Sequence, residues 1–320
     1  MTDDLTPEHW QHIDTAEAGT TATAYLDAAA AAIAAPRLRS HQLLGIEPGA
    51  TVLDVGCGTG IALREIAELV GPGGTVVGLD PSAAMLEQAR VRLEDAPARV
   101  ELVKGTATNT GLDTDRFDAV RTERVLMHVS QPIDALAELA RVTRPGGRVV
   151  LVEPDHRRLA LDTDTPDVWV RFITAFSRML PNISAGLRAP SDATTLGLGV
   201  TSIEPIGYQF RSNSLFTEVF NLEVGRDAAL QEGITEAEFD ALLEEMAVRC
   251  REGRFLAVGT MYVVVVERGS AERDRSTDPA LQWHCRPGRV TDCSQAQRDG
   301  AVQRRRGGRP RVVGAVCRRA

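Results

Sequence analysis

The sequence predicts an α/β protein with a doubly wound parallel sheet, and three observations support this fold class. Short apolar, β-branched runs recur along residues 51–155, and segments with apolar residues at helical spacing lie between them. Alternation at this spacing produces right-handed crossovers, and hence a parallel sheet with helices on both faces. A glycine-rich turn directly follows the first strand-like run, where such sheets bind their ligands.

The expected strands and helices of this core follow one another in strict order. The strand-like runs are "TVLDVG" (51–56), "GTVVGLD" (74–80), "RVELVKG" (99–105), "FDAVRT" (117–122) and "RVVLVEPD" (148–155). The helical patterns between them are "IALREIAELV" (61–70), "SAAMLEQARVRLE" (82–94) and "PIDALAELARVT" (132–143). No internal repeat interrupts this order, so a single doubly wound domain is expected.

Further elements are expected on both sides of the core. Ahead of it, "AYLDAAAAAIAAP" and "RLRSHQLLGI" predict two helices separated by Pro36. After it, we expect a helix near 167–180, a strand near 200–211, more helix, and a last strand at 255–268. The expected divisions are a helical amino-terminal cap (1–45), a ligand-binding core (46–156), the remainder of the sheet (157–268) and a tail (269–320).

The tail differs from the rest of the chain in charge. Residues 271–320 hold twelve arginines against five acids, a net charge of +7, so the first 270 residues carry −15. Because the tail lacks apolar periodicity and is rich in Arg, Gly, Pro and Gln, we expect it to be disordered. It could be a basic arm for nucleic acid or anionic membrane, a solvated tail, or an out-of-frame or artificially added extension.

Composition limits the class of protein. Of the 320 residues, 43% are hydrophobic and 25% are charged, as in ordinary globular proteins. Without an 18-residue apolar run or a charged-then-apolar amino terminus, we expect no membrane span, no secretory signal and a cytoplasmic location. The five cysteines form no CxxC pair, which argues against a disulfide framework and a zinc site, so no metal is expected. Monomer and homodimer both stay open.

The turn "GCGTG" places Gly56, Gly58 and Gly60 at alternate positions after the first expected strand. Gly56 and Gly58 let the backbone bend sharply and approach a ligand, and Gly60 permits close packing of the next helix. Asp80, twenty residues beyond Gly60 at the end of the second expected strand, is placed to accept hydrogen bonds from both hydroxyls of a ribose. A nucleoside cofactor is therefore expected.

The kind of cofactor depends on details of the turn. Dinucleotide sites use GxGxxG, whereas this turn is GxGxG, with Ile61 where the last glycine would be needed. Asp54 would repel a pyrophosphate but suits a ligand with an ammonium group and a sulfonium. The sequence "VLDVGCGTG" followed by "VVGLDPS" resembles the class I S-adenosylmethionine-dependent methyltransferases, and the resemblance continues through residues 117–155.

This resemblance implies a Rossmann-like, seven-stranded sheet whose last strand, here 255–268, runs antiparallel. It also implies S-adenosylmethionine as the cofactor. The positions that it places on the methionine part are Asp54 and the backbone of Gly56, Cys57, Gly58 and Gly60, with Cys57 as a small residue that offers its N–H. Those that it places on the ribose and adenine are Asp80, Pro81 and Met85.

Further positions carry alternatives. Relatives usually have an acid where Thr106 stands; threonine can hydrogen-bond to the adenine amino group but brings no charge, so the backbone of Ala107 could contribute more. Glu123 and Arg124 could line the carboxylate and ammonium end of the cofactor, or form a solvated ion pair at a helix start. Tyr25 could cover the cofactor, or be a core residue of the amino-terminal helices.

Methyl transfer requires little from side chains, because the sulfonium already supplies a good leaving group. The protein must align the reactants and exclude water, and an oxygen or nitrogen nucleophile with a proton to lose also needs a base. The candidates for that base are His128, Glu153, Asp155 and His156. The alternatives are a packed residue for His128, helix caps for the two acids, and an exposed side chain for His156.

Residues 212–253 form a long connection with helical spacing between the last two expected strands. With the segment 167–183 and the amino-terminal helices, it would make a lid over a mostly apolar pocket for a small organic acceptor. Ordinary core is the alternative for most of its apolar positions. The acidity of the folded part argues against RNA or DNA as a substrate.

The sequence thus predicts a methyltransferase for a small organic acceptor, such as a secondary metabolite or quinone-like compound. It resembles the ubiquinone and menaquinone C-methyltransferases and related enzymes of bacterial natural-product pathways. One alternative is a protein of this fold that keeps the cofactor while catalysing a cyclisation or rearrangement. Another is a cofactor-binding regulatory module that uses its basic tail on nucleic acid.

Overall fold

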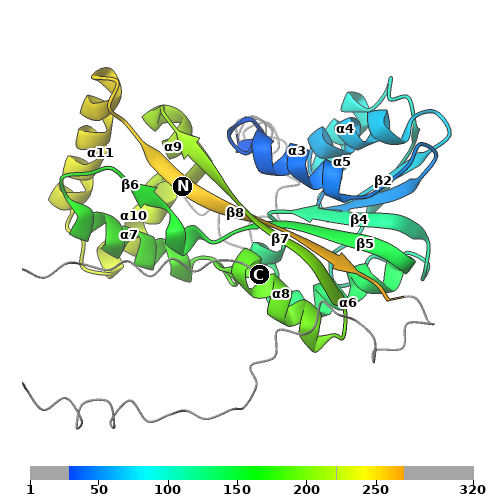
Figure 1. The fold of residues 1–320 in the computed structure, drawn as a ribbon. Coiled ribbons are helices and arrows are strands. Elements are labelled where there is room, and N and C mark those ends of the chain that lie inside the picture. Colours follow the sequence, from blue (N-terminus) through cyan, green and yellow to red (C-terminus); the bar gives the residue numbers. More distant parts are fainter. Residues whose placement is uncertain (1–28, 221, 270–320) are drawn as a thin grey trace, which may run out of the picture. The chain divides into compact units, whose positions relative to one another are not determined.

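The computed structural model describes residues 29–220 and 222–269 of the chain. Within them, one eight-stranded sheet runs in the order β3-β2-β1-β4-β5-β8-β6, with β7 also paired to β8 (Figure 1). The strands are β1 (Thr51–Val55), β2 (Thr75–Asp80), β3 (Arg99–Lys104), β4 (Phe117–Glu123), β5 (Thr143–Pro154), β6 (Ala160–Leu161), β7 (Gly199–Phe210) and β8 (Ala257–Glu267). Tyr25 and the basic tail lie outside the described residues.

The sheet confirms the doubly wound, Rossmann-like fold. Strands β1 to β5 pair in parallel, and β8 runs antiparallel to β5, as the resemblance implied for the last strand. The two-residue strand β6, which pairs with Val258 and Ala257 of β8, was not predicted and makes the eighth strand. Strands as short as β6 carry too few residues for an alternation pattern to show.

Helices cover both faces of the parallel part of the sheet, and further helices lie beside β8, beyond that part (Figure 1). They are α3 (Ala34–Leu43), α4 (Ile61–Val70), α5 (Ala83–Arg92), α6 (Pro132–Val142), α7 (Pro166–Arg178), α8 (Ala185–Thr195), α9 (Asn213–Phe220), α10 (Leu222–Gln231) and α11 (Glu236–Arg251). Two short 3₁₀ turns follow strand ends: η1 (Leu126–His128) and η2 (His156–Arg158). None of the helices in the described segments is long and apolar enough to cross a membrane.

Two helical regions differ from the expectation. Residues 29–32 are helical, and the break before α3 falls at Ile33 instead of Pro36. Pro36 lies in the first turn of α3, where its missing N–H costs no helical hydrogen bond. Helix α8 was not predicted, because Gly186 and Pro190 weaken its pattern. A side chain at Gly186 would overlap with the backbone oxygen of Glu153, so the glycine lets α8 pack directly on β5.

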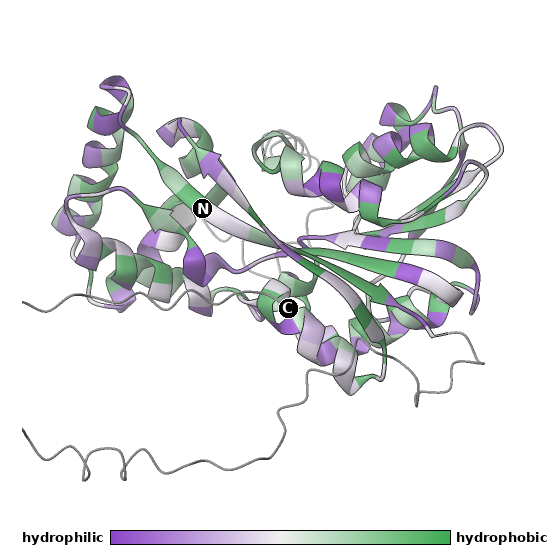
Figure 2. Cartoon of the chain, viewed as in Figure 1, coloured by the Kyte–Doolittle hydropathy of each residue, from purple (hydrophilic) through white to green (hydrophobic). Residues whose placement is uncertain are grey.

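An aromatic cluster fills the region beyond β5, between α7, α9, α11 and the adjoining ends of β7 and β8. Its members are Trp169, Phe172, Phe176, Phe210, Phe216, Phe220, Phe239 and Phe255. Seven of the eight phenylalanines of the chain are therefore in this one cluster. Phe216 and Phe220 are closest, with ring centroids 4.9 Å apart. In Figure 2 the helices of this region carry hydrophobic bands beside hydrophilic ones, as expected of helices with one packed face.

Candidate functional site

A cavity of about 800 Å³ lies at the carboxyl ends of the parallel strands. At one end, here called the turn end, it is lined by residues 54–59 and 79–82. At the other, the aromatic end, it is lined by Phe176, Tyr208, Phe210 and Phe220. This volume and mixed lining are typical of small-molecule sites, and ligands of doubly wound folds bind at these strand ends.

The turn end is built by the glycines. Gly56, Gly58 and Gly60 all have positive φ, of 71°, 51° and 80°. A side chain at Gly56 would also overlap with Val125 Cγ2, and one at Gly60 would lie 3.0 Å from Ala89 Cβ. Conformation and space therefore both require the absence of side chains here, as the sequence predicted.

The N–H groups of this turn bond within the protein. Gly56 N and Cys57 N both donate to Leu79 O, at 2.7 Å and 3.1 Å, and Gly60 N donates to Cys57 O. The Cys57 N–H therefore bonds to the end of β2 in this structure, and its role toward a ligand stays a prediction. At these positions the turn leaves space for a ligand, while its N–H groups bond within the protein.

Asp80 joins the turn to the end of β2. Its two carboxylate oxygens accept hydrogen bonds from Gly58 N and Ser82 N, each at 2.9 Å, while the Ser82 side chain caps α5 by accepting from Met85 N. A carboxylate is also the group that ribose hydroxyls would donate to, as predicted for Asp80. Asp80 thus has a structural role in addition to the predicted ligand role.

A buried arginine, Arg121, stands beside Asp54 and was not predicted as a site residue. Its Nη1 lies 3.1 Å from Asp54 Oδ1, its Nη2 donates to Glu123, and its Nε donates to Ser40 Oγ at 2.8 Å. The parallel register pairs Asp54 with Arg121 directly. A charged residue in the middle of an otherwise apolar strand was the only sequence signal for it.

The group of Asp54, Arg121 and Glu123 carries a formal charge of −1 when both acids are ionised. Burial raises the pKa of Asp54 to about 6, against the lowering effect of Arg121, and Glu123 adds to the rise. A cationic ligand beside this group would favour the ionised carboxylate. The ion pair of Glu123 is with Arg121, so the alternative of a solvated Glu123–Arg124 pair is wrong.

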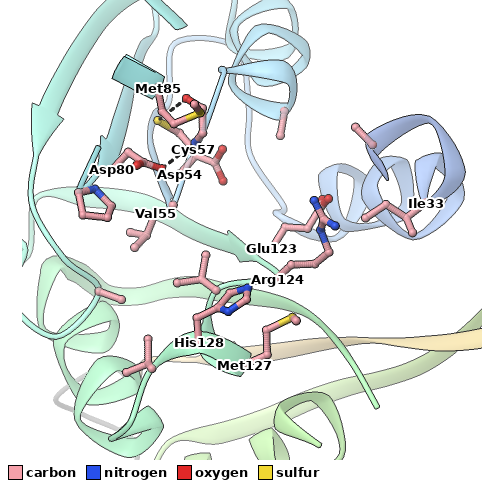
Figure 3. A pocket seen from close by; sticks show the side chains of 18 of the residues that line it. Ile33, Asp54, Val55, Cys57, Asp80, Met85, Glu123, Arg124, Met127 and His128 are labelled. Atoms are coloured by element: carbon pink, nitrogen blue, oxygen red, sulfur yellow. Dashed lines mark hydrogen bonds between the residues drawn. The ribbon is translucent and has the colours of Figure 1, made fainter. Parts of the chain in front are cut away.

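Arg124, His128 and His156 also line the cavity. Figure 3 shows Arg124, Met127 and His128 together, apart from Asp80, Cys57 and Met85. Burial first, and the charge of Arg124 second, lower the pKa of His128 to about 4 and that of His156 to about 3. Both imidazoles are therefore neutral near pH 7, and their roles as bases stay predictions.

The two acids proposed as bases lie outside the cavity lining. Glu153 is fully buried, and its Oε1 accepts from Val125 N at 2.9 Å and Leu126 N at 2.8 Å. Burial raises the pKa of Glu153 to about 7, against the lowering effect of these N–H groups. Asp155 caps η2 by accepting from Arg157 N. Glu153 thus holds the η1 turn that carries His128.

The remaining predicted positions line the turn end. Pro81, Met85, Thr106 and Ala107 all border the cavity, and Thr106 forms an isolated bridge with Asn109. Lys104, the single lysine of the chain, borders it too and was not predicted. In the described segments, no group of three or more His, Cys, Asp or Glu side chains is placed to hold a metal ion.

Sequence comparison with known proteins identifies the family of this chain. The family described as "Methyltransferase domain" matches residues 53–151, from β1 into β5. A demethylmenaquinone methyltransferase from Lactococcus lactis is 33% identical over 141 residues, or 44% of this chain and 56% of that enzyme. The chain belongs to the class I S-adenosylmethionine-dependent methyltransferases.

Two further proteins, one similar in sequence and one in fold, match a larger share of this methyltransferase. An uncharacterized 37.1 kDa protein in transposon TN4556 of Streptomyces fradiae is 37% identical over 249 residues, or 76% of this chain and 70% of that protein. A solved structure from Bacillus halodurans superposes with a TM-score of 0.53 at 18% identity, covering 73% of this chain and 99% of that one, which shows the fold alone. The methyltransferase spans about half the length of the quinone methyltransferases that it matches, from 44% to 59%.

The turn end fits S-adenosylmethionine. The cofactor carries a sulfonium and an ammonium group, and the Asp54, Arg121 and Glu123 group supplies an uncompensated negative charge beside the glycine turn. Asp80 places a carboxylate on the cavity wall for ribose hydroxyls, and Met85 and Ala107 offer apolar surface. The charge and the apolar surface of the turn end thus fit the sulfonium, ammonium and adenosine parts of this cofactor.

Proposed function

We propose that this methyltransferase transfers the methyl group of S-adenosylmethionine to a small, largely apolar organic acceptor, such as a secondary metabolite or quinone-like compound. The observation that supports it is that one cavity is lined both by the glycine turn and by side chains of the aromatic cluster. A cofactor bound at the turn end and an acceptor bound at the aromatic end would then meet inside the protein. The names of the quinone methyltransferase relatives agree with this substrate class.

The chain's own residues would act mainly by binding and orientation. Asp54, held by Arg121, and the glycine turn would fix the methionine part of the cofactor, and Asp80 its ribose. The bound cofactor supplies an electrophilic methyl on a good leaving group. The aromatic end would hold the acceptor in line and exclude water, and such positioning can contribute up to about 7–11 kcal/mol to the lowering of the barrier.

The test is mass spectrometry of an extract from source cells that lack this protein, incubated with the purified protein and methyl-labelled cofactor. A labelled small molecule that forms with the wild type, and at least tenfold more slowly with the Asp80→Ala variant, is the expected result. Calorimetry in parallel should detect binding of S-adenosylmethionine and its demethylated product but not NAD. Cofactor binding without any labelled product would contradict the transferase proposal.

A further inference from the structure

Arg124 is the feature of the cavity that the proposed function does not use. Its backbone has a positive φ of 55°, and its N–H donates to Val152 O of β5 at 2.9 Å. A non-glycine residue in this conformation costs free energy, which the surrounding structure must offset. The chain thus holds an arginine at a fixed and unfavourable position on the cavity wall.

The guanidinium of Arg124 has no ion-pair partner among the described residues. The neighbouring acid, Glu123, is paired with Arg121, and the buried Arg124 Nε has no hydrogen-bond partner. Arg124 as a whole is half-buried, but a buried donor such as its Nε is costly without a partner. An arginine of this kind in a ligand cavity suits an anionic ligand group, because its planar donor set matches an oxygen anion.

His156 gives a second, independent sign of a polar ligand group here. The residue is 7% exposed and lines the cavity, and its Nδ1 is buried without a hydrogen-bond partner in the described structure. Its ring meets Phe176 and Phe220 edge-on, with centroids 6.0 Å and 5.5 Å away. The imidazole therefore stands where the polar wall changes into the aromatic end.

The place of this group favours the acceptor over the cofactor. The ammonium and sulfonium of the cofactor have a matching negative charge at Asp54, Arg121 and Glu123, and the cofactor's carboxylate is the anion that competes with an acceptor for Arg124. Arg124 lines the cavity together with His128 and His156, and the ring of His156 meets the aromatic cluster edge-on at Phe220. Aromatic walls around one cation suit an apolar molecule that carries one negative charge.

We propose that Arg124, which lines the same cavity as His128 and His156, binds an oxygen anion on the acceptor. The acceptor class is then an apolar, aromatic-sized molecule with one carboxylate or one acidic phenol or enol hydroxyl. This inference rests on the proposed function, because it places the methyl acceptor at the aromatic end. Arg124 would select and orient the acceptor, and the two neutral imidazoles would contribute hydrogen bonds to the same oxygen.

The test compares 2-naphthoate with its neutral analogue 2-naphthamide, each titrated by calorimetry into protein saturated with S-adenosylhomocysteine. The wild type should bind the carboxylate at least tenfold more tightly than the amide. The Arg124→Asn variant should lose this preference, since asparagine tolerates the positive φ but carries no charge. The Arg124→Lys variant should keep part of it, and Arg158→Gln, which removes an exposed arginine of η2, should keep all of it.

A third probe, 4-nitrophenol, separates the two sources of the anion, because its absorption spectrum reports ionisation. Stabilised phenolate in the wild type but not in Arg124→Asn would identify an acidic hydroxyl; preference for naphthoate alone would identify a carboxylate. Equal binding of naphthoate and naphthamide by the wild type would overturn the proposal. So would a tenfold loss of S-adenosylhomocysteine affinity in Arg124→Asn, because Arg124 would then serve the cofactor.

Failure of the proposed function has a different signature. If no extract yields a labelled product while the charge preference is present, the anion site stands and methyl transfer does not. If a labelled product forms while the preference is absent, the transferase stands and the role given to Arg124 is wrong.

Discussion

The turn end and the aromatic end of the cavity differ in how the chain builds them. The turn end comes from a few contiguous residues after β1 and β2, where glycines remove side chains and acids supply charge. The aromatic end is assembled from α7, α9, β7 and β8, which are far apart in the sequence. The comparison suggests that one end is specified by local conformation and charge, and the other by the packing of large side chains.

If this contrast is right, damage to the aromatic cluster should affect folding and leave cofactor affinity unchanged. Phe216 is fully buried between Trp169 and Phe255. Phe216→Ala should lower the free energy of unfolding by about 3–5 kcal/mol, through lost burial and the cavity left behind. Urea titration measures this change, and calorimetry with S-adenosylhomocysteine should give an unaltered Kd. A folded variant with weakened cofactor binding would show that the ends are coupled.

At the turn end, a single methyl group should have a large effect. Gly56→Ala introduces a side chain at positive φ and against Val125, so we expect a loss of about 2–4 kcal/mol in stability or in cofactor affinity. Gly253→Ala is the matched control, because Gly253 has the same φ of 71° with open space around it. Removing the obstructing methyls in Gly56→Ala/Val125→Ala should recover part of the loss. Equal costs at the two glycines would mean that space at Gly56 does not matter.

Asp80 tests whether charge at the turn end serves the ligand. Asp80→Ala should weaken cofactor binding by about 1.5–3 kcal/mol, at least roughly tenfold, because charge-assisted hydrogen bonds are lost. Stability should also fall by about 0.5–2 kcal/mol, since Gly58 N and Ser82 N lose their acceptor. Ser82→Ala removes the side-chain cap of α5 but keeps the Asp80 carboxylate, so it should lower the melting temperature and change cofactor affinity much less than Asp80→Ala. Unchanged affinity in Asp80→Ala would leave Asp80 with a purely structural role.

The smallest expected effect is pH-dependent and concerns Glu153, the buried acid of β5 that accepts hydrogen bonds from the backbone at η1. Its folded pKa of about 7 is above the ordinary value, so the folded state keeps a proton that the unfolded state loses. Stability should therefore fall as pH rises from about 4.5 to about 7, by about 1–3 kcal/mol in total. Glu153→Gln, which stays neutral, should show a flatter profile of melting temperature against pH. The exposed Glu68→Gln is the control, and parallel profiles would contradict the assignment.

The parts of this molecule that could be predicted from sequence depend on neighbours along the chain. The strands β1 to β5, the turn of Gly56, Gly58 and Gly60, and the position of Asp80 all leave local patterns of apolar or small residues. By contrast, the pairing of Asp54 with Arg121 depends on the register between β1 and β4, which no local pattern states. The hydrogen bond that Cys57 N donates could not be predicted for the same reason, because its acceptor, Leu79 O, belongs to β2.

The acceptor side was less predictable, since its wall is made by tertiary contacts. His156 was expected to be exposed if it was not a base; it is buried against Phe176 and Phe220 from two different helices. Glu153 lies in a strand that reads as apolar, and only the fold shows that its carboxylate meets the backbone of η1. Side-chain partners supplied by distant segments cannot be read from spacing.

Strand β8 has a mechanical consequence for the enzyme. From Met261 to Glu267 it pairs with β5, and before that point Ala257 and Val258 pair with β6, while β7 follows it along its whole length. A hydrogen-bonded ribbon resists bending in its plane and yields most easily by twisting. Relative motion of the two ends would then be a torsion of the β7–β8 ribbon instead of rotation about a flexible linker, and it would be transmitted to Pro154 and Glu153 through their fixed register with Met261 and Tyr262.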